Sequence, residues 1–263
     1  MKKLSVRIVL AICCVWTGWI SSGSAQKLPF PIGEELIYTI TWNAIPVAWS
    51  KSVTQMDTYE GRPVVALRMT TETYAFFDHI YKVVDFHESL IDPETLLPIR
   101  YVANIREGSY SSHEVTTFDY TTMQAHHRQM GSGVEKTYTI KPDARDILSQ
   151  LYFLRSIELK PNSKSQYSVM TDEKVYDLFL TTLGIKSISL PKYVEDVASI
   201  EVKPEASFDG LFVKNGKATV WISRDSRHLM TLARLSVPFG RVSVTLSEVN
   251  GPGDDFWITK KEQ

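Results

Sequence analysis

The sequence predicts a mainly β protein, in which an antiparallel meander forms a curved or barrel-like sheet with one covering α-helix. Apolar and polar residues alternate along many short segments, as they do in strands that bury one face. Turn residues separate these segments at short intervals, whereas parallel crossovers need about a dozen residues or more. Only one segment has apolar residues at helical spacing, so we expect a single helix.

The N-terminus, residues 1–25, has the features of a signal peptide. It has a positively charged start, an apolar run over Ile8–Trp16 and small residues over Gly23–Ala25, so cleavage is expected after Ala25. A retained membrane anchor is the less favoured alternative, because the apolar run is shorter than the ~20 residues that span a bilayer. The mature chain is therefore expected to be periplasmic or otherwise exported, and soluble.

The cysteines and the net charge exclude several classes of protein. Cys13 and Cys14 both lie in the expected signal peptide, so the mature chain would contain neither a disulfide nor a cysteine-ligated metal. Neither cysteine follows a small residue, so a lipid anchor is not expected. The chain has 29 basic residues, of which three lie in the leader, against 30 acidic ones. Nucleic acid is therefore not an expected partner.

The alternating segments place the strands in order along the chain. Alternation is clearest at residues 36–42, where Tyr38 and Ile40 fall on one face and Thr39 and Thr41 on the other, and again at 65–70 and 241–246. A tight hairpin turn is indicated at Asn215-Gly216, because both residues tolerate positive φ angles. Further strands are expected near residues 83–91, 99–106, 114–120, 134–140, 166–170, 197–202 and 218–223.

The expected helix runs over residues 143–157. Asp143 follows Pro142 and is the expected N-cap, and the apolar stripe comprises Ile147, Leu148, Leu151, Leu154 and Ile157. We expect Asp143 and Asp146 to lie in the first turn and to cap the helix rather than to act in acid–base catalysis. The stripe should cover the open face or mouth of the curved sheet.

The mature chain is expected to form one domain. No Gly/Ser-rich linker, charge block or long repeat divides it, so we assign residues 26–250 to a single antiparallel β domain and residues 251–263 to a polar C-terminal tail.

No catalytic or metal-binding motif is recognised. Asp85, His87 and Ser89 share a strand face, but residues two apart lie roughly 6.5 Å from each other, whereas triad partners need about 3 Å. We therefore expect a solvated polar face there. His126 and His127 are adjacent and should point to opposite faces, so they do not predict a metal site. No catalytic residue, metal or cofactor is assigned.

The aromatic residues are the remaining candidates for function. They make up 11% of the chain, and ordinary core packing is the first explanation for them. The functional alternative is an apolar cavity or groove in the curved sheet, with Tyr74, Phe76 and Phe77 at its rim. The candidate ligand-binding residues are Trp42, Tyr74, Phe76, Phe77, Tyr81, Tyr152 and Trp221.

Four stretches, taken in order, resemble a bacterial family called domain of unknown function 3108. They are FPIGEELIYTITW (Phe30–Trp42), IYKVVDFHESLIDPETLLPIRY (Ile80–Tyr101), DILSQLYFLR (Asp146–Arg155) and VWISRDSRHLM (Val220–Met230). The resemblance implies an exported antiparallel β protein of the Gram-negative envelope, with one helix against a curved or barrel-like sheet. The family has no agreed activity, so it implies no catalytic residues. The chain departs from the pattern at Ile45–Ala48, where similar sequences tend to have glycine, which leaves the local bend of the second strand open.

Three functional hypotheses follow. The leading one is a non-enzymatic periplasmic protein that holds a lipid-like or other apolar envelope component in a curved sheet. The second is an envelope assembly or scaffold protein that binds a protein partner. The third is an enzyme acting on envelope lipid or glycan, which would require a cleft with at least two carboxylates or histidines in hydrogen-bonding reach. Two polar residues of these stretches have structural explanations. Glu34 follows Gly33 at the start of a strand, and Arg155 lies near the helix end, where the helix dipole favours a cation.

Overall fold

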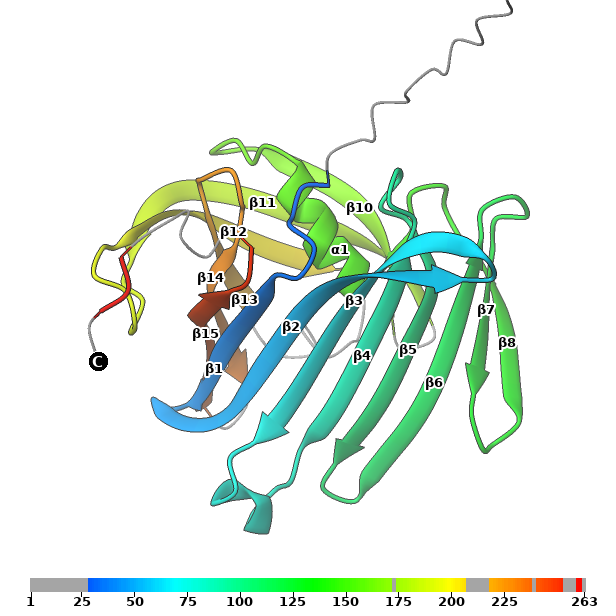
Figure 1. The fold of residues 1–263 in the computed structure, drawn as a ribbon, viewed down its shortest axis with the longest axis horizontal. Helices are drawn as coiled ribbons and strands as arrows, with labels where there is room; N and C mark the ends of the chain where they lie inside the picture. Colours follow the sequence, from blue (N-terminus) through cyan, green and yellow to red (C-terminus); the bar gives the residue numbers. More distant parts are fainter. Residues whose placement is uncertain (1–27, 172–173, 207–217, 238–239, 253–258, 262–263) are drawn as a thin grey trace, which may run out of the picture.

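The computed structural model describes residues 28–171, 174–206, 218–237, 240–252 and 259–261. Fifteen strands form one sheet in the order β8-β7-β6-β5-β4-β3-β2-β1-β15-β14-β13-β12-β11-β10-β9 (Figure 1). The sheet is open, with β8 and β9 at its two edges. The expected antiparallel meander with one α-helix is confirmed for the described residues, and β9–β10 is the single parallel pair among these strands.

The strand bounds show longer strands than the alternation alone suggested. The strands are β1 (Glu35–Trp42), β2 (Ile45–Tyr59), β3 (Arg62–Thr73), β4 (Val84–Ile91), β5 (Pro98–Glu107), β6 (Tyr110–Asp119), β7 (Gln124–Gln129), β8 (Val134–Thr139), β9 (Arg145–Asp146), β10 (Lys164–Thr171), β11 (Lys174–Ile188), β12 (Val197–Ala206), β13 (Ala218–Ser223), β14 (Met230–Val237) and β15 (Gly240–Asn250).

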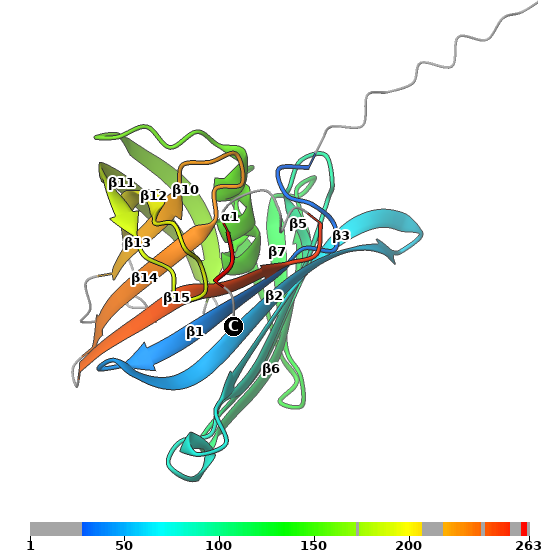
Figure 2. The ribbon, with the colours of Figure 1, turned by 60° about the vertical axis from the view of Figure 1, so that its left-hand side comes forward.

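The first and last strands of the chain, β1 and β15, lie side by side in the middle of the sheet. β1 and β15 pair antiparallel, with Tyr38 opposite Leu246 and Thr41 opposite Ser243. Every other antiparallel neighbour is consecutive in the chain, so this pair joins the two meander halves, β1–β8 and β9–β15. Figure 2 shows β15 and β1 running together between the two halves.

The helix is shorter than expected and has a different N-cap. Helix α1 spans Ile147–Phe153 and continues as a 3-10 turn, η2, over Leu154–Ser156. The prediction of Asp143 as the N-cap is wrong: Asp146 caps the helix and accepts the amide N–H groups of Leu148 and Ser149, each at 2.9 Å. Arg145 and Asp146 pair with β10 as strand β9, which keeps the chain extended until that point.

The helix packs against side chains from both meander halves. Leu148 and Tyr152 contact a cluster that includes Leu67, and Leu154 packs in a cluster with Ile200. In Figure 2 the helix accordingly lies between the two halves of the curved sheet. The expected covering role is confirmed, but Leu151 is 39% exposed and does not belong to the buried stripe. Buried Gln150 and Tyr152 lie on either side of it in the sequence.

Other predictions fall at the ends of the chain. The expected signal peptide, residues 1–25, lies outside the described residues. The sheet ends at Asn250, where the single domain was expected to end. In the described part of the tail, Lys260 pairs with Tyr193. Among the described residues no helix has the length and apolar character needed to cross a membrane.

Candidate functional site

A groove lies over strands β14, β15 and β1. The register places Leu232 opposite Thr245, Arg234 opposite Ser243, and Thr41 opposite Ser243, so these side chains project from one face of the sheet. Because side chains alternate along a strand, Val244 and Leu246 project from the other face, where they pack in the core. The groove therefore lies on the polar face of these strands, and their opposite, apolar face packs in the core.

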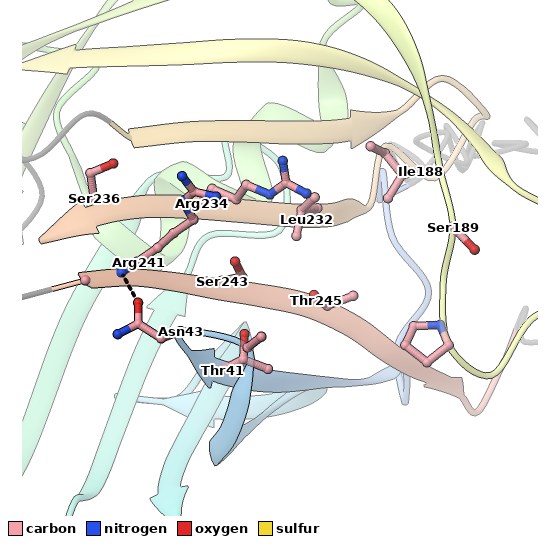
Figure 3. Close-up of a pocket in the computed structure, with 13 residues that line it drawn as sticks. Thr41, Asn43, Ile188, Ser189, Leu232, Arg234, Ser236, Arg241, Ser243 and Thr245 are labelled. Carbon is pink, nitrogen blue, oxygen red and sulfur yellow. Dashed lines mark hydrogen bonds between the residues drawn. The ribbon is translucent and has the colours of Figure 1, made fainter.

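The segment at the end of β11 forms another wall of the groove (Figure 3). The groove is partly open to solvent and has a volume of about 760 Å³, which is within the range of small-molecule pockets. Its apolar lining comes from Ala44, Ile188, Pro191 and Leu232. Its polar lining comes from Thr41, Asn43, Ser189, Arg234, Ser236, Arg241, Ser243 and Thr245.

The lining carries positive charge. Arg234 and Arg241 both contribute to it, and none of the described residues that line the groove is Asp, Glu or His. The Arg234 guanidinium lies 5.3 Å from the centroid of the Trp221 ring, which holds the arginine in place by a cation–π contact. Near Trp221, Glu201 is already paired with Lys186 at 2.5 Å. The groove is therefore an electropositive site with an apolar wall.

Trp42 lies at the margin of the groove. A Cβ on Gly240 would come within 2.7 Å of the Trp42 ring nitrogen, so the absence of a side chain at Gly240 allows this close approach. Asn43 accepts the Arg241 amide N–H through Oδ1 at 2.9 Å (Figure 3). These contacts hold the β1–β2 turn against β15. The Trp42 side chain itself remains 45% exposed.

The seven predicted ligand residues do not form one site. Trp42 lies beside the groove, and Trp221 is 5% exposed under Arg234. Tyr152 is buried in the core, where its hydroxyl lies 2.7 Å from Ser52 Oγ. Tyr74, Phe76, Phe77 and Tyr81 all lie in the connection between β3 and β4, at the lower end of the sheet in Figure 1.

The β3–β4 connection carries a group of exposed apolar side chains, which we call the aromatic rim: Tyr74, Phe76, Ile80 and Tyr81. Phe76 is 75% exposed and Ile80 is 73% exposed. A 3-10 turn, η1 (Phe77–His79), shapes this connection, and the Asp78 carboxylate accepts the Thr73 hydroxyl at 2.6 Å. The expected rim position of Tyr74 and Phe76 thus corresponds to an exposed apolar patch at one end of the sheet.

Sequence reasoning missed the arginines of the groove. It identified Arg241, Ser243 and Thr245 as the polar side of an alternating strand. Alternation does not distinguish a row of side chains that faces solvent from one that lines a groove. The wall at Ile188 comes from a distant part of the chain, so only the tertiary structure brings it to this strand.

The residues that suggested a triad bind separate partners. Ser89 donates to Asp146 at 2.6 Å, His87 lies 2.8 Å from the Tyr101 hydroxyl, and Asp85 accepts the Arg106 amide N–H at 2.9 Å. The expected solvated face is wrong for two of the three, because Ser89 is fully buried and Asp85 is 8% exposed. Ser89 is buried because its hydroxyl binds the carboxylate that caps α1.

A carboxyl pair lies on the same face of the sheet as His87. Burial and the neighbouring Asp85 carboxylate, which is within hydrogen-bonding reach, raise the pKa of Glu107. Burial lowers the pKa of the His87 imidazole. None of these residues lines the groove. His126 and His127 point to opposite faces, since His126 is exposed and His127 buried. Within the described part of the chain, no cluster of three or more His, Asp or Glu side chains could hold a metal ion.

The chain is similar to one protein family and to solved structures. The family model described as "Protein of unknown function (DUF3108)" matches residues 37–247. A β-barrel-like protein of domain of unknown function DUF1849 from Brucella abortus is similar in structure, with 7% identity and a TM-score of 0.54 over 83% of this chain and 97% of that chain. A putative exported protein with a YmcC-like fold from Bacteroides fragilis has 7% identity and a TM-score of 0.35, over 85% and 98% of the two chains.

No curated protein matches the chain. The likeness to the Brucella protein extends to the fold alone, because only 7% of the aligned residues are identical. The family model covers most of the β domain, from β1 to β15. The chain therefore belongs to the DUF3108 family, as its four ordered stretches suggested.

Proposed function

We propose that this chain is a non-enzymatic periplasmic protein that holds a lipid-like component of the cell envelope. The binding site is the groove over β14, β15 and β1. The groove itself carries the proposal, because a site of about 760 Å³ that combines an apolar wall with hydroxyl and guanidinium groups matches the two-sided chemistry of an amphiphile.

The apolar wall gives an acyl chain a place to leave water. Ile188, Pro191 and Leu232 supply it, and each methylene that they bury contributes about 0.8 kcal/mol. The half-exposed Trp42 ring at the margin supports the same assignment, because an indole has an apolar body and a polar N–H suited to such a boundary.

Location in the periplasm is supported by the leader. Residues 1–25 combine a positive start, an apolar run and small residues before the expected cleavage site. A lipid-like ligand is available to a protein delivered to that compartment. The interior of the curved sheet offers a poorer site, because α1 and the core clusters of both meander halves fill it.

A probe-binding experiment tests the proposal. The full chain, expressed with its own leader in a Gram-negative host, is purified from the periplasmic fraction and titrated with the neutral apolar dye N-phenylnaphthylamine. Ser243→Phe should fill the groove and weaken dye binding by about tenfold or more. Ser111→Phe, at an exposed position on β6, is the matched control and should leave dye binding unchanged.

Native mass spectrometry of the same preparation should detect a co-purifying lipid in the wild type and less of it in the Ser243→Phe variant. Retention of the uncleaved chain in the cytoplasm would contradict the proposed location. Equal dye binding by both phenylalanine variants would contradict the groove as the site.

The aromatic rim favours a second candidate function, an envelope assembly protein that binds a protein partner. Its exposed side chains form an apolar patch of the kind found in protein interfaces. A photoreactive amino acid at Phe76 should then crosslink to another protein in cells, whereas the same group at Glu60, in the β2–β3 turn, should not. Recovery of only the uncrosslinked chain from both positions would count against this candidate.

A further inference from the structure

We infer that the groove selects an anionic amphiphile, and that Arg234 and Arg241 hold the phosphate or carboxylate of its headgroup. The inference deepens the proposed function and rests on it, because it names the class of ligand. It goes beyond the shape of the groove to the charge of its lining.

The two arginines form an uncompensated positive pair. Their groove contains no carboxylate, and neither side chain has an ion-pair partner among the residues that the structure describes. Elsewhere on the sheet Arg68 pairs with Glu88 at 2.7 Å, and Arg128 with Glu135 at the same distance. Glu201, which lies near Trp221, is already paired with Lys186. A bound anion would supply the missing negative charge.

The register brings the two guanidinium groups to neighbouring strands. Arg234 is opposite Ser243, and Arg241 precedes Ser243 by two residues on the same face, so the two arginines are diagonal neighbours. Such positions lie roughly 7–8 Å apart, well within the reach of arginine side chains. Figure 3 shows the Arg241 side chain extending from β15 toward β14, where Arg234 lies. One oxyanion could therefore bind both.

The side chains around this pair suit an anionic headgroup. A guanidinium is a planar fork that binds a phosphate or carboxylate with two N–H groups, and the contact with Trp221 limits the freedom of Arg234 before a ligand binds. The hydroxyls of Thr41, Ser243 and Thr245 add neutral donors. Leu232 and Ile188 leave an apolar surface for the attached chain.

Isothermal titration below the micellar concentration tests the inference with three probes. Lauroyl lysophosphatidylglycerol and monolauroyl glycerol share an acyl chain and a glycerol, and only the first carries a phosphate. Inorganic phosphate carries the charge without the chain. We expect the anionic lipid to bind at least about tenfold more tightly than the neutral one. A hydrogen bond to a charged group contributes enough binding free energy for a change in affinity of about this size. Inorganic phosphate should bind more weakly than the anionic lipid.

Arginine variants assign the selectivity to the two residues. The double variant Arg234→Gln/Arg241→Gln should lose the preference and bind the anionic lipid about as weakly as it binds the neutral one. Arg62→Gln, at the exposed start of β3, is the matched control and should keep the full preference. Higher salt should weaken the binding of the anionic lipid alone.

The outcomes separate this inference from the proposed function. Equal affinity for both lipids, or an anionic preference that survives in the double glutamine variant, would overturn the inference while lipid binding stood. Inorganic phosphate that bound as tightly as the anionic lipid would also overturn it, because the site would then be a phosphate site. Failure of both lipids to bind would overturn the proposed function, and the inference with it.

Discussion

Arg155 and Glu34 form a two-point ion pair inside the fold, although they lie 121 residues apart in the sequence. Arg155 Nη1 donates to Glu34 Oε2 at 2.5 Å, and Nη2 donates to Oε1 at 3.0 Å. Arg227 also donates to Glu34 Oε1, and its backbone carbonyl accepts Arg155 Nε–H at 2.9 Å. The buried carboxylate of Glu34, the residue before β1, thus links the start of the sheet to the turn after α1 and to the β13–β14 connection.

Substitution of Glu34 should destabilise the fold strongly. Glu34 is fully buried, and Arg155 and Arg227 are 6% and 5% exposed, so Glu34→Gln leaves two buried guanidinium charges without their carboxylate. Loss of one partner from a buried ion pair costs about 3–5 kcal/mol. Urea denaturation followed by circular dichroism should show this decrease in the free energy of unfolding.

Glu35→Gln is the matched control, one residue further along the chain. Glu35 lies 3.5 Å from Lys51, and both side chains are substantially exposed, so the loss should be no more than about 1 kcal/mol. Similar free energies of unfolding for the two glutamine variants would show that the buried network does not stabilise the fold.

The alternation of residues predicted much of the sheet, but it missed strands that bury polar side chains. β2 buries Ser50, Ser52 and Thr54 on the face toward the helix, so it has no alternating apolar row. The Thr54 hydroxyl donates to the Pro31 carbonyl at 2.7 Å, so this buried polar group has a hydrogen-bond partner. Strand β7 buries His127 in the same way. Binary patterning cannot identify such strands, because it equates polar with exposed.

The groove and the ion network were beyond prediction for another reason. The sequence suggested that Arg155 interacts with the helix dipole. In the structure its partner is the carboxylate of Glu34, which lies before the first strand. Similarly, Thr41 and Arg241 line one groove because β1 pairs with β15, and local periodicity does not specify which strands join the two halves of a meander. Both sites depend on contacts between segments distant in the sequence.

Removal of the Tyr152 hydroxyl should cost stability and leave ligand binding intact. Burial raises the pKa of Tyr152 to about 12, so the hydroxyl stays protonated and shares its hydrogen bond with Ser52. Tyr152→Phe leaves Ser52 Oγ without that bond and should reduce the free energy of unfolding by about 1–3 kcal/mol. Thermal denaturation measures the loss, and Tyr110→Phe, at a 55% exposed site, is the control.

Dye binding by the Tyr152→Phe variant distinguishes a core residue from a ligand-binding one. Tyr152 is 5% exposed and does not line the groove, so the dissociation constant should equal that of the wild type. A weakened dye complex in a variant that remains folded would instead support the original assignment of Tyr152 to the ligand site.

The stability of the folded protein should depend on pH through the carboxyl pair of Asp85 and Glu107. Burial and the Asp85 carboxylate raise the pKa of Glu107 above its ordinary value of 4.5, so the folded state holds this proton more tightly than the unfolded state. The contribution of Glu107 to stability is therefore present below pH 4.5 and is lost as the pH rises through the raised pKa. Glu107→Gln cannot ionise, so its stability relative to the wild type should increase over that interval.

Urea denaturation at several pH values measures this difference. Glu94→Gln is the control, because Glu94 is exposed in the turn between β4 and β5 and should give no such pH-dependent difference. A constant gap between wild type and Glu107→Gln at all pH values would be inconsistent with coupling between the two carboxyls.

Gly251 should tolerate alanine less well than another glycine with the same backbone conformation. Gly251 and Gly61 have φ angles of +82° and +76°, where an L-residue costs about 1–2 kcal/mol. A Cβ on Gly61 would meet nothing within 4 Å, whereas a Cβ on Gly251 would overlap the backbone carbonyl oxygen of Gly33. Gly251→Ala should therefore lose more free energy of unfolding than Gly61→Ala, by roughly 1–3 kcal/mol. Equal losses in urea denaturation would mean that the backbone around Gly33 moves to accept the methyl group and does not hold Glu34 rigidly in the buried network.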